Sequence, residues 1–153
     1  AHPQLLRAVL DINQHQRHQV LVKLRSLLGG LGDRRVGMLG LSFKPNTDDI
    51  RESASIRIIE MLMAEGVAVR AYDPVAMPEA LKVLKGVEMG TDPYDTAAGC
   101  DALVIATEWN QFRNLDLPRL KGLMKAAVLL DLRNVYEPED LKKHGFRYAA
   151  VGR

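Results

Sequence analysis

The chain has 153 residues, 47% of them hydrophobic, which predicts one domain with enough apolar side chains for a proper core. A formal net charge of +2, no apolar run of membrane-spanning length and no signal-peptide pattern give no support for nucleic-acid-binding, membrane or secreted classes. The single cysteine, Cys100, excludes an internal disulfide and a cysteine-based metal cluster, so we expect a reducing, cytoplasmic setting.

The first segment, Pro3–Leu28, is predicted to be one long helix because its apolar residues recur at helical spacing. Its middle, residues 13–19, is polar, so we expect one or two turns there to face solvent or another chain. His15 and His18 lie three apart and could share a face, but no third ligand is evident nearby and we predict no metal site. Glycines that begin at Gly29 are expected to end this helix.

The next stretch combines a strand, a charged loop and a helix. The apolar run 36–41, with glycines at 37 and 40, predicts a buried strand that backbone can approach closely. The loop after it is rich in charged residues, and a helix that Ser53 or Ser55 could cap is predicted to run to about Glu65. Open α/β sheets bind ligands in such loops, at the carboxyl end of a strand. A surface loop of salt bridges is the alternative.

Strands and helices alternate through the rest of the chain. The further predicted strands are 67–72, a weak one near 87, 102–106, 128–132 and 146–151, and the predicted helices are 78–85, 93–98, 117–124 and 138–143. This alternation predicts an α/β fold: a Rossmann-like, doubly wound, mostly parallel six-stranded sheet with a long N-terminal helix. In the strand order 3-2-1-4-5-6, the loops 42–51 and 107–112 open onto one crevice, with Arg133 beside it.

Two cations and an aromatic ring at this edge suggest a phosphate-bearing ligand. Lys44 is a compact cation that can pair with a pyrophosphate oxygen, and Phe43 before it could stack on a base or pack in the core. Arg51 offers a planar fork for phosphate or carboxamide groups, or it pairs with a nearby acid at position 48, 49 or 52. Arg133 could reach a phosphate or could pin the C-terminal strands.

Other residues near this edge are assigned structural roles. Asp73 follows the second strand, where an acid often binds a ribose hydroxyl, but the upstream Gly37-x-x-Gly40 lacks the full G-x-G-x-x-G pattern. We therefore expect Asp73 to shape the turn. Trp109 is expected to pack under the crevice. Asp48 and Asp49 are not predicted to form an acid/base pair, because adjacent side chains in a loop need not converge.

Four motifs follow one another along the chain: GLSFKPNTDDIRES, AEGVAVRAYDP, DALVIATEWNQF and DLRNVY. In this order and spacing the chain resembles the carboxy-terminal domain of the UDP-glucose/GDP-mannose dehydrogenase family, from about Gly37 onward. The resemblance implies that residues 31–153 form a Rossmann-like domain that binds a sugar nucleotide. It also implies that residues 1–30 are the end of a central helix that joins the domains and contributes to a homodimer.

The resemblance further implies roles for four residues. Phe43 and Lys44 would hold the nucleotide half of a UDP-sugar, with Arg133 matched less securely, and Arg51 would reach toward NAD bound on another domain. The whole enzyme would oxidise the sugar C6 alcohol to a carboxylate in two NAD-dependent steps through a catalytic cysteine. Cys100 lies ahead of an apolar strand and not in a glycine-rich nucleophile loop, so no catalytic residue is assigned and we expect no turnover by this chain alone.

The substrate prediction leaves alternatives. The loop sequence FKPNTDDIRES favours UDP-glucose, which would be oxidised to UDP-glucuronate, while GDP-mannose and UDP-N-acetyl-hexosamines remain open because other parts of such an enzyme read the base and the sugar. A function of another class is a stand-alone nucleotide-binding module without catalysis. The upstream sequence would discriminate, since a dinucleotide fingerprint and a cysteine motif there indicate the dehydrogenase.

Overall fold

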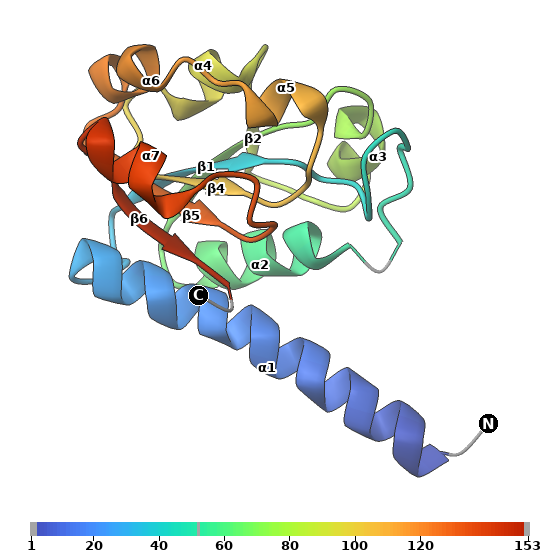
Figure 1. Ribbon diagram of the computed structural model, residues 1–153. Coiled ribbons are helices and arrows are strands. Elements are labelled where there is room, and N and C mark those ends of the chain that lie inside the picture. Colours follow the sequence, from blue (N-terminus) through green and yellow to red (C-terminus); the bar gives the residue numbers. More distant parts are fainter. Residues whose placement is uncertain (1–2, 52, 152–153) are drawn as a thin grey trace.

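The computed structural model describes residues 3–51 and 53–151, with side chains from residue 15 onward. Within them one six-stranded sheet has the order β3-β2-β1-β4-β5-β6, and every neighbouring pair is parallel (Figure 1). The strands are β1 Arg35–Leu39, β2 Ala68–Tyr72, β3 Glu88–Met89, β4 Ala102–Ile105, β5 Val128–Asp131 and β6 Arg147–Ala150. The predicted fold class and strand order are confirmed.

The central strands are short apolar runs because both faces of the sheet are covered. Every residue of β4 and of β5 is buried. Leu39 pairs with Ile105, which pairs in turn with Asp131. Since these three residues end β1, β4 and β5, the loops that follow leave the sheet at one level.

Helices cover the two faces of the sheet in separate layers (Figure 1). The helices are α1 Pro3–Leu28, α2 Ala54–Ala64, α3 Met77–Leu81, α4 Pro93–Ala97, α5 Asn110–Arg113, α6 Leu117–Leu123 and α7 Pro138–Lys143. One hydrophobic cluster joins the sheet to α1, α2 and α3, and a second joins it to the helices from α4 to α7. This two-sided packing is the doubly wound arrangement that the alternation predicted.

Helix α1 extends past the edge of the domain (Figure 1). Its C-terminal half packs on the sheet layer through Val20, Leu21 and Leu24, all buried, whereas residues 15–19 are mostly exposed, as predicted for the polar middle. The guanidinium of Arg147 donates to the carbonyl oxygen of Leu27 at 2.6 Å and anchors the end of α1 to β6. Among the helices described, none combines the length and the apolar character needed to cross a membrane.

Three details of the start of α2 and the edge of the sheet differ from the predictions. Strand β1 ends at Leu39 because Gly40 adopts φ +105°, which takes the chain out of the extended conformation. Ser53 occupies the N-cap position of α2 but does not cap it, since its hydroxyl donates to the carbonyl oxygen of Leu41 at 2.7 Å. A short helix, α5, begins at Asn110, inside the segment 107–112 that we predicted to be a loop.

Candidate functional site

Three loops meet at the carboxyl edge of the sheet, as the strand order predicted. The loops after β4 and β5 are joined by a hydrogen bond from Nε of Arg133 to the carbonyl oxygen of Ala106, at 3.0 Å. The loops after β1 and β4 are in tight contact, because a Cβ on Gly40 would overlap Oγ1 of Thr107. Glycine is therefore required at position 40 for two reasons, its positive φ and this contact.

The loop after β1 is compact and presents Phe43 and Lys44 outward. The backbone N–H of Phe43 donates to the carbonyl oxygen of Asp49 at 2.8 Å, which closes the loop on itself. Asn46 turns the chain with φ +65°, a conformation that asparagine tolerates. The Phe43 side chain is 49% exposed, so the alternative of a core phenylalanine is wrong.

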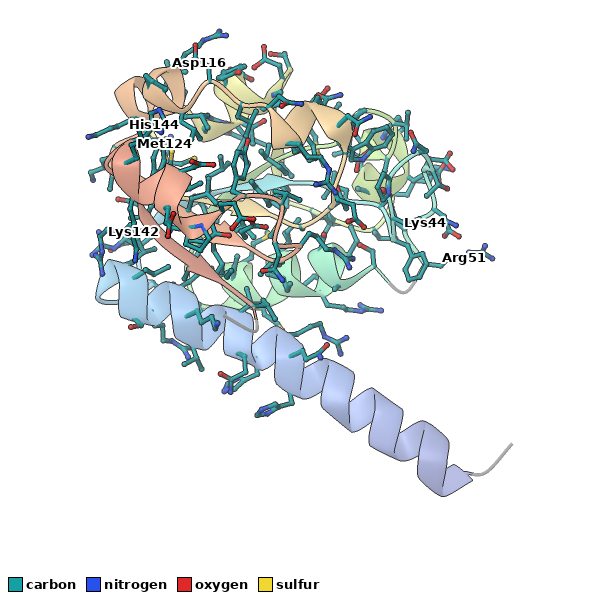
Figure 2. All side chains as sticks on the ribbon, in the orientation of Figure 1. Lys44, Arg51, Asp116, Met124, Lys142 and His144 are labelled. Carbon is teal, nitrogen blue, oxygen red and sulfur yellow. The ribbon has the colours of Figure 1, made fainter. Side chains whose placement is uncertain are left out.

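Lys44 is exposed, and no ion pair to it is found within the described residues. Figure 2 shows Lys44 and Arg51 projecting from the same end of the molecule, away from the end that carries Lys142 and His144. The loop thus exposes an aromatic ring and a cation at consecutive positions beyond the carboxyl end of β1. This pair can stack on a flat ring and neutralise an anionic group.

Arg51 forms the ion pair that was the alternative to a ligand role. Its Nε and Nη2 donate to the two carboxylate oxygens of Asp49, each at 3.0 Å. These hydrogen bonds from Arg51 hold the pKa of the Asp49 carboxyl below its ordinary value of 3.8. The Arg51 side chain is 87% exposed, so the pair lies on the surface and orients the guanidinium at the mouth of the loop.

Arg133 joins the loops that follow β4 and β5, in line with the structural one of its two predicted roles. Its backbone N–H donates to Oδ1 of Asp131 at 3.1 Å, and its Nε holds the loop after β4. Within residues 15–51 and 53–151, no hydrogen bond or ion pair links Arg133 to Phe43 or Lys44. The structure therefore places Arg133 at the same edge, where its Nε binds the loop after β4 and not Phe43 or Lys44.

Asp73 is fully buried and accepts hydrogen bonds on both carboxylate oxygens. Oδ2 accepts from the N–H groups of Leu41, at 2.8 Å, and Ser42, at 3.3 Å. Oδ1 accepts from the N–H groups of Val75, at 2.9 Å, and Ala76, at 2.8 Å. Because the carboxylate faces inward and both oxygens are bound, it shapes the turn, as predicted, and is not placed to bind a ribose hydroxyl.

A second buried carboxylate, Asp131 at the end of β5, was not singled out from the sequence. It holds the loop of Arg133 by accepting from the N–H groups of Arg133 and Tyr136, and from the hydroxyl of Tyr148 at 2.8 Å. The signal for it is a single acidic residue that closes an otherwise apolar strand. Buried carboxylates are normally paired by hydrogen bonds, so such a residue predicts a loop anchor.

Three further predictions concern residues outside the charged loop. Cys100 is 2% exposed, its thiol donates to the carbonyl oxygen of Thr96 at 3.2 Å, and burial raises its pKa, which is the pattern of an inert structural cysteine. Trp109 packs on the second hydrophobic cluster, as predicted, and its Nε1 has no hydrogen-bond partner within the described residues. Across that part of the chain, no cluster of three His, Cys, Asp or Glu side chains suitable for a metal ion is found.

A separate concavity lies between α1 and α2. It is an open groove of about 620 Å³, lined by Arg17, His18, Arg57, Glu60, Met61 and Ala64. These side chains come from the middle of α1 and from α2, and none belongs to the loops after β1, β4 and β5. We assign the candidate site to the strand ends because the charged and aromatic loop residues gather there.

Comparison with known proteins agrees with this geometry. The model of the UDP-glucose/GDP-mannose dehydrogenase family, UDP binding domain, matches residues 37–138. A UDP-glucose 6-dehydrogenase of Rhizobium meliloti is 44% identical over 150 residues, covering 97% of this chain and 34% of the relative. The UDP-glucose 6-dehydrogenase TuaD of Bacillus subtilis is 39% identical, covering 97% of this chain and 32% of the relative.

Solved structures show the same fold. A UDP-glucose dehydrogenase from Pyrobaculum islandicum matches with a TM-score of 0.77 and 36% identity, covering 88% of this chain and 30% of that one. A UDP-D-ManNAc dehydrogenase from Pyrococcus horikoshii matches with a TM-score of 0.81 over 100% of this chain and 34% of that one; at 24% identity this likeness shows the fold alone. The chain thus spans about a third of the length of these relatives. It belongs to the UDP-glucose/GDP-mannose dehydrogenase family, whose UDP binding domain matches residues 37–138.

Proposed function

We propose that the chain is the carboxy-terminal, sugar-nucleotide-binding domain of an NAD-dependent UDP-glucose 6-dehydrogenase. The observation that carries this proposal is the loop after β1, which presents an exposed aromatic ring and an exposed lysine at the carboxyl edge of the sheet. The names of the two relatives, both UDP-glucose 6-dehydrogenases, favour UDP-glucose over GDP-mannose and UDP-N-acetyl-hexosamines.

Three residues would bind the nucleotide. Lys44 pairs with an oxygen of the pyrophosphate, because its ammonium is exposed and makes no ion pair within the described residues. Phe43 stacks on the base or on the ribose face through its exposed ring. Arg133 contributes guanidinium N–H groups to a phosphate from the neighbouring loop, while its Nε stays bound to Ala106.

NAD would be held mainly by another domain of the enzyme. We assign no dinucleotide site to the described residues, since the Gly37-x-x-Gly40 fingerprint is incomplete and Asp73 faces inward. When bound, NAD accepts the hydride in each of the two oxidations that convert the C6 alcohol to a carboxylate. Arg51, exposed at the mouth of the loop, is the residue of this chain that reaches toward it.

The division of the chain follows from the same proposal. Residues 31–153 are the binding domain, and residues 1–30 are the end of the helix that joins it to the rest of the enzyme and contributes to a homodimer. The catalytic cysteine comes from the rest of the enzyme, because Cys100 is buried just ahead of β4, at the opposite edge of the sheet. The chain alone should show no turnover. A free, buried thiol fits a reducing cytoplasm.

Titration of the chain with UDP and with GDP, followed by NMR chemical shifts, tests the proposal. We expect UDP to bind more tightly than GDP. Lys44→Ala should weaken UDP binding about 10- to 150-fold, because one charge-assisted hydrogen bond is worth about 1.5–3 kcal/mol. Lys142→Ala, an exposed lysine at the opposite end of the molecule, is the matched control and should bind as the wild type does. No UDP binding by the wild type, or equal binding by Lys44→Ala, would contradict the proposal.

A further inference from the structure

The loop that carries Phe43 and Lys44 is held at its base by a series of hydrogen bonds that begins at Asp73, directly after β2. The buried Asp73 carboxylate accepts from the backbone N–H groups of Leu41 and Ser42, which lead directly into the loop. The Ser42 hydroxyl in turn donates to the carbonyl oxygen of Lys44 at 2.7 Å. The conformation of the exposed pair therefore depends on a carboxylate about thirty residues away in the sequence, which itself touches no solvent.

We propose that Asp73 is a positioning residue for nucleotide binding, which it serves by fixing the backbone of Leu41 and Ser42 so that Phe43 and Lys44 are presented to the ligand. This inference rests on the proposed function. A carboxylate suits this place because its two oxygens accept from donors on two sides at once. Oδ1 holds its own turn at Val75 and Ala76, and Oδ2 holds the neighbouring loop.

Asp73→Asn is the informative substitution, because it keeps the size of the side chain and replaces one acceptor oxygen with a donor. If the remaining oxygen of the new side chain still accepts from the N–H groups of Val75 and Ala76, the new NH₂ group faces the N–H groups of Leu41 and Ser42. These groups are all donors, so no hydrogen bond can form between them. The strand β2 and its turn stay paired, whereas the base of the β1 loop loses its acceptor. The loop should then sample other conformations.

Asp101→Asn is the matched control. Asp101 is also a buried carboxylate, and it accepts from the backbone N–H of Arg35 at 2.9 Å, but it lies at the opposite edge of the sheet. Both substitutions make the same chemical change at a buried backbone acceptor. Asp73 binds the loop that carries Lys44, whereas Asp101 does not. A general loss of stability would therefore weaken UDP binding in both variants, whereas a loss of positioning would weaken it in Asp73→Asn alone.

The test compares UDP affinity, measured well below the melting temperature, and amide hydrogen exchange in the wild type and both variants. We expect Asp73→Asn to bind UDP at least about tenfold more weakly and to exchange the Leu41 and Ser42 amides faster, with Asp101→Asn close to wild type in both. If the wild type binds UDP and Asp73→Asn binds equally well, the positioning role is wrong and the proposed function stands. If the wild type does not bind UDP, the proposed function fails, and this inference with it.

Ser42→Ala provides a second measurement if Asp73→Asn does not fold. It removes the hydroxyl that links Ser42 to the carbonyl of Lys44 and leaves the carboxylate in place. We expect weaker UDP binding than in wild type with a smaller loss than for Lys44→Ala. Unchanged UDP affinity in Ser42→Ala would overturn the relay from Asp73 to Lys44.

Discussion

Replacing Arg51 with lysine separates two roles for this side chain, because lysine keeps the charge and loses the planar fork. In the structure the fork binds both oxygens of Asp49 at 3.0 Å while the Arg51 side chain is 87% exposed. An ion pair this exposed adds little to the free energy of unfolding. Loss of the fork should therefore lower the Tm of the chain by no more than about 2–4 °C.

The proposed contact with NAD predicts a much larger effect on kinetics. Loss of one charge-assisted contact, worth about 1.5–3 kcal/mol, should raise the KM for NAD about 10- to 150-fold in the whole enzyme. The KM for UDP-glucose should change much less, and Lys44→Ala should show the opposite balance. The two KM values and the Tm of Arg51→Lys, measured in the whole enzyme, distinguish the roles.

Arg57→Lys is the control for this experiment, since Arg57 also forms an exposed ion pair, with Glu60 at 2.9 Å, but on the surface of α2. It should leave both KM values unchanged. Unchanged NAD kinetics in Arg51→Lys, together with a lowered Tm, would show that Arg51 only ties the loop down. An equal rise in both KM values would likewise refute a specific contact with NAD.

Two predictions concern pH. Arg51 lowers the pKa of Asp49 in the folded chain below 3.8, so the ion pair stabilises the fold above pH 3.8, and this stabilisation is lost as the pH falls through the folded pKa. An NMR titration should show that the pKa of Asp49 rises toward 3.8 in Arg51→Lys. Burial raises the pKa of Tyr136 to about 12 from 10.0, so its neutral hydroxyl stabilises the fold below pH 10 and the effect is lost as pH rises through 12. Tyr136→Phe removes the hydrogen bonds to the Phe112 carbonyl and from the Leu115 N–H, at a cost of about 1–3 kcal/mol each in the free energy of unfolding at neutral pH. Thermal unfolding measured between about pH 7 and 12 should then show that the variant loses less stability than the wild type as the pH rises.

The fold could be predicted from the sequence because the apolar runs and turn residues that set its strands and helices are local features of the chain. Strand 102–106 is an apolar run between Asp101 and Thr107, and strand 128–132 is apolar except for Asp131. Both were predicted within one residue of the observed bounds. The parallel alternation then leaves few topologies, and the order 3-2-1-4-5-6 was correct. Helix α5 was missed because four residues are too few for a helical period to show.

The contacts that support the site were less accessible, because they join residues that are far apart in the chain. Propensity placed Ser53 at the start of α2, yet its hydroxyl binds the carbonyl of Leu41, twelve residues earlier. Arg51 was expected to pair with an acid at position 48, 49 or 52. Of the two that the structure describes, Asp48 and Asp49, Asp49 forms the ion pair with Arg51. Local sequence restricts the partners of a side chain, whereas the tertiary arrangement decides between them.

The two aspartates that close β2 and β5 show why residue type alone does not assign a role at this edge. An acid after the second strand of a doubly wound sheet is the usual ligand of a ribose, and Asp73 occupies that position. It is turned inward to four backbone N–H groups from the loop and the turn, at distances from 2.8 to 3.3 Å. Asp131 likewise serves the loop of Arg133. At both strands the carboxylate binds the backbone of the loop, so we expect the proposed ligand to be met by the exposed side chains that these loops present.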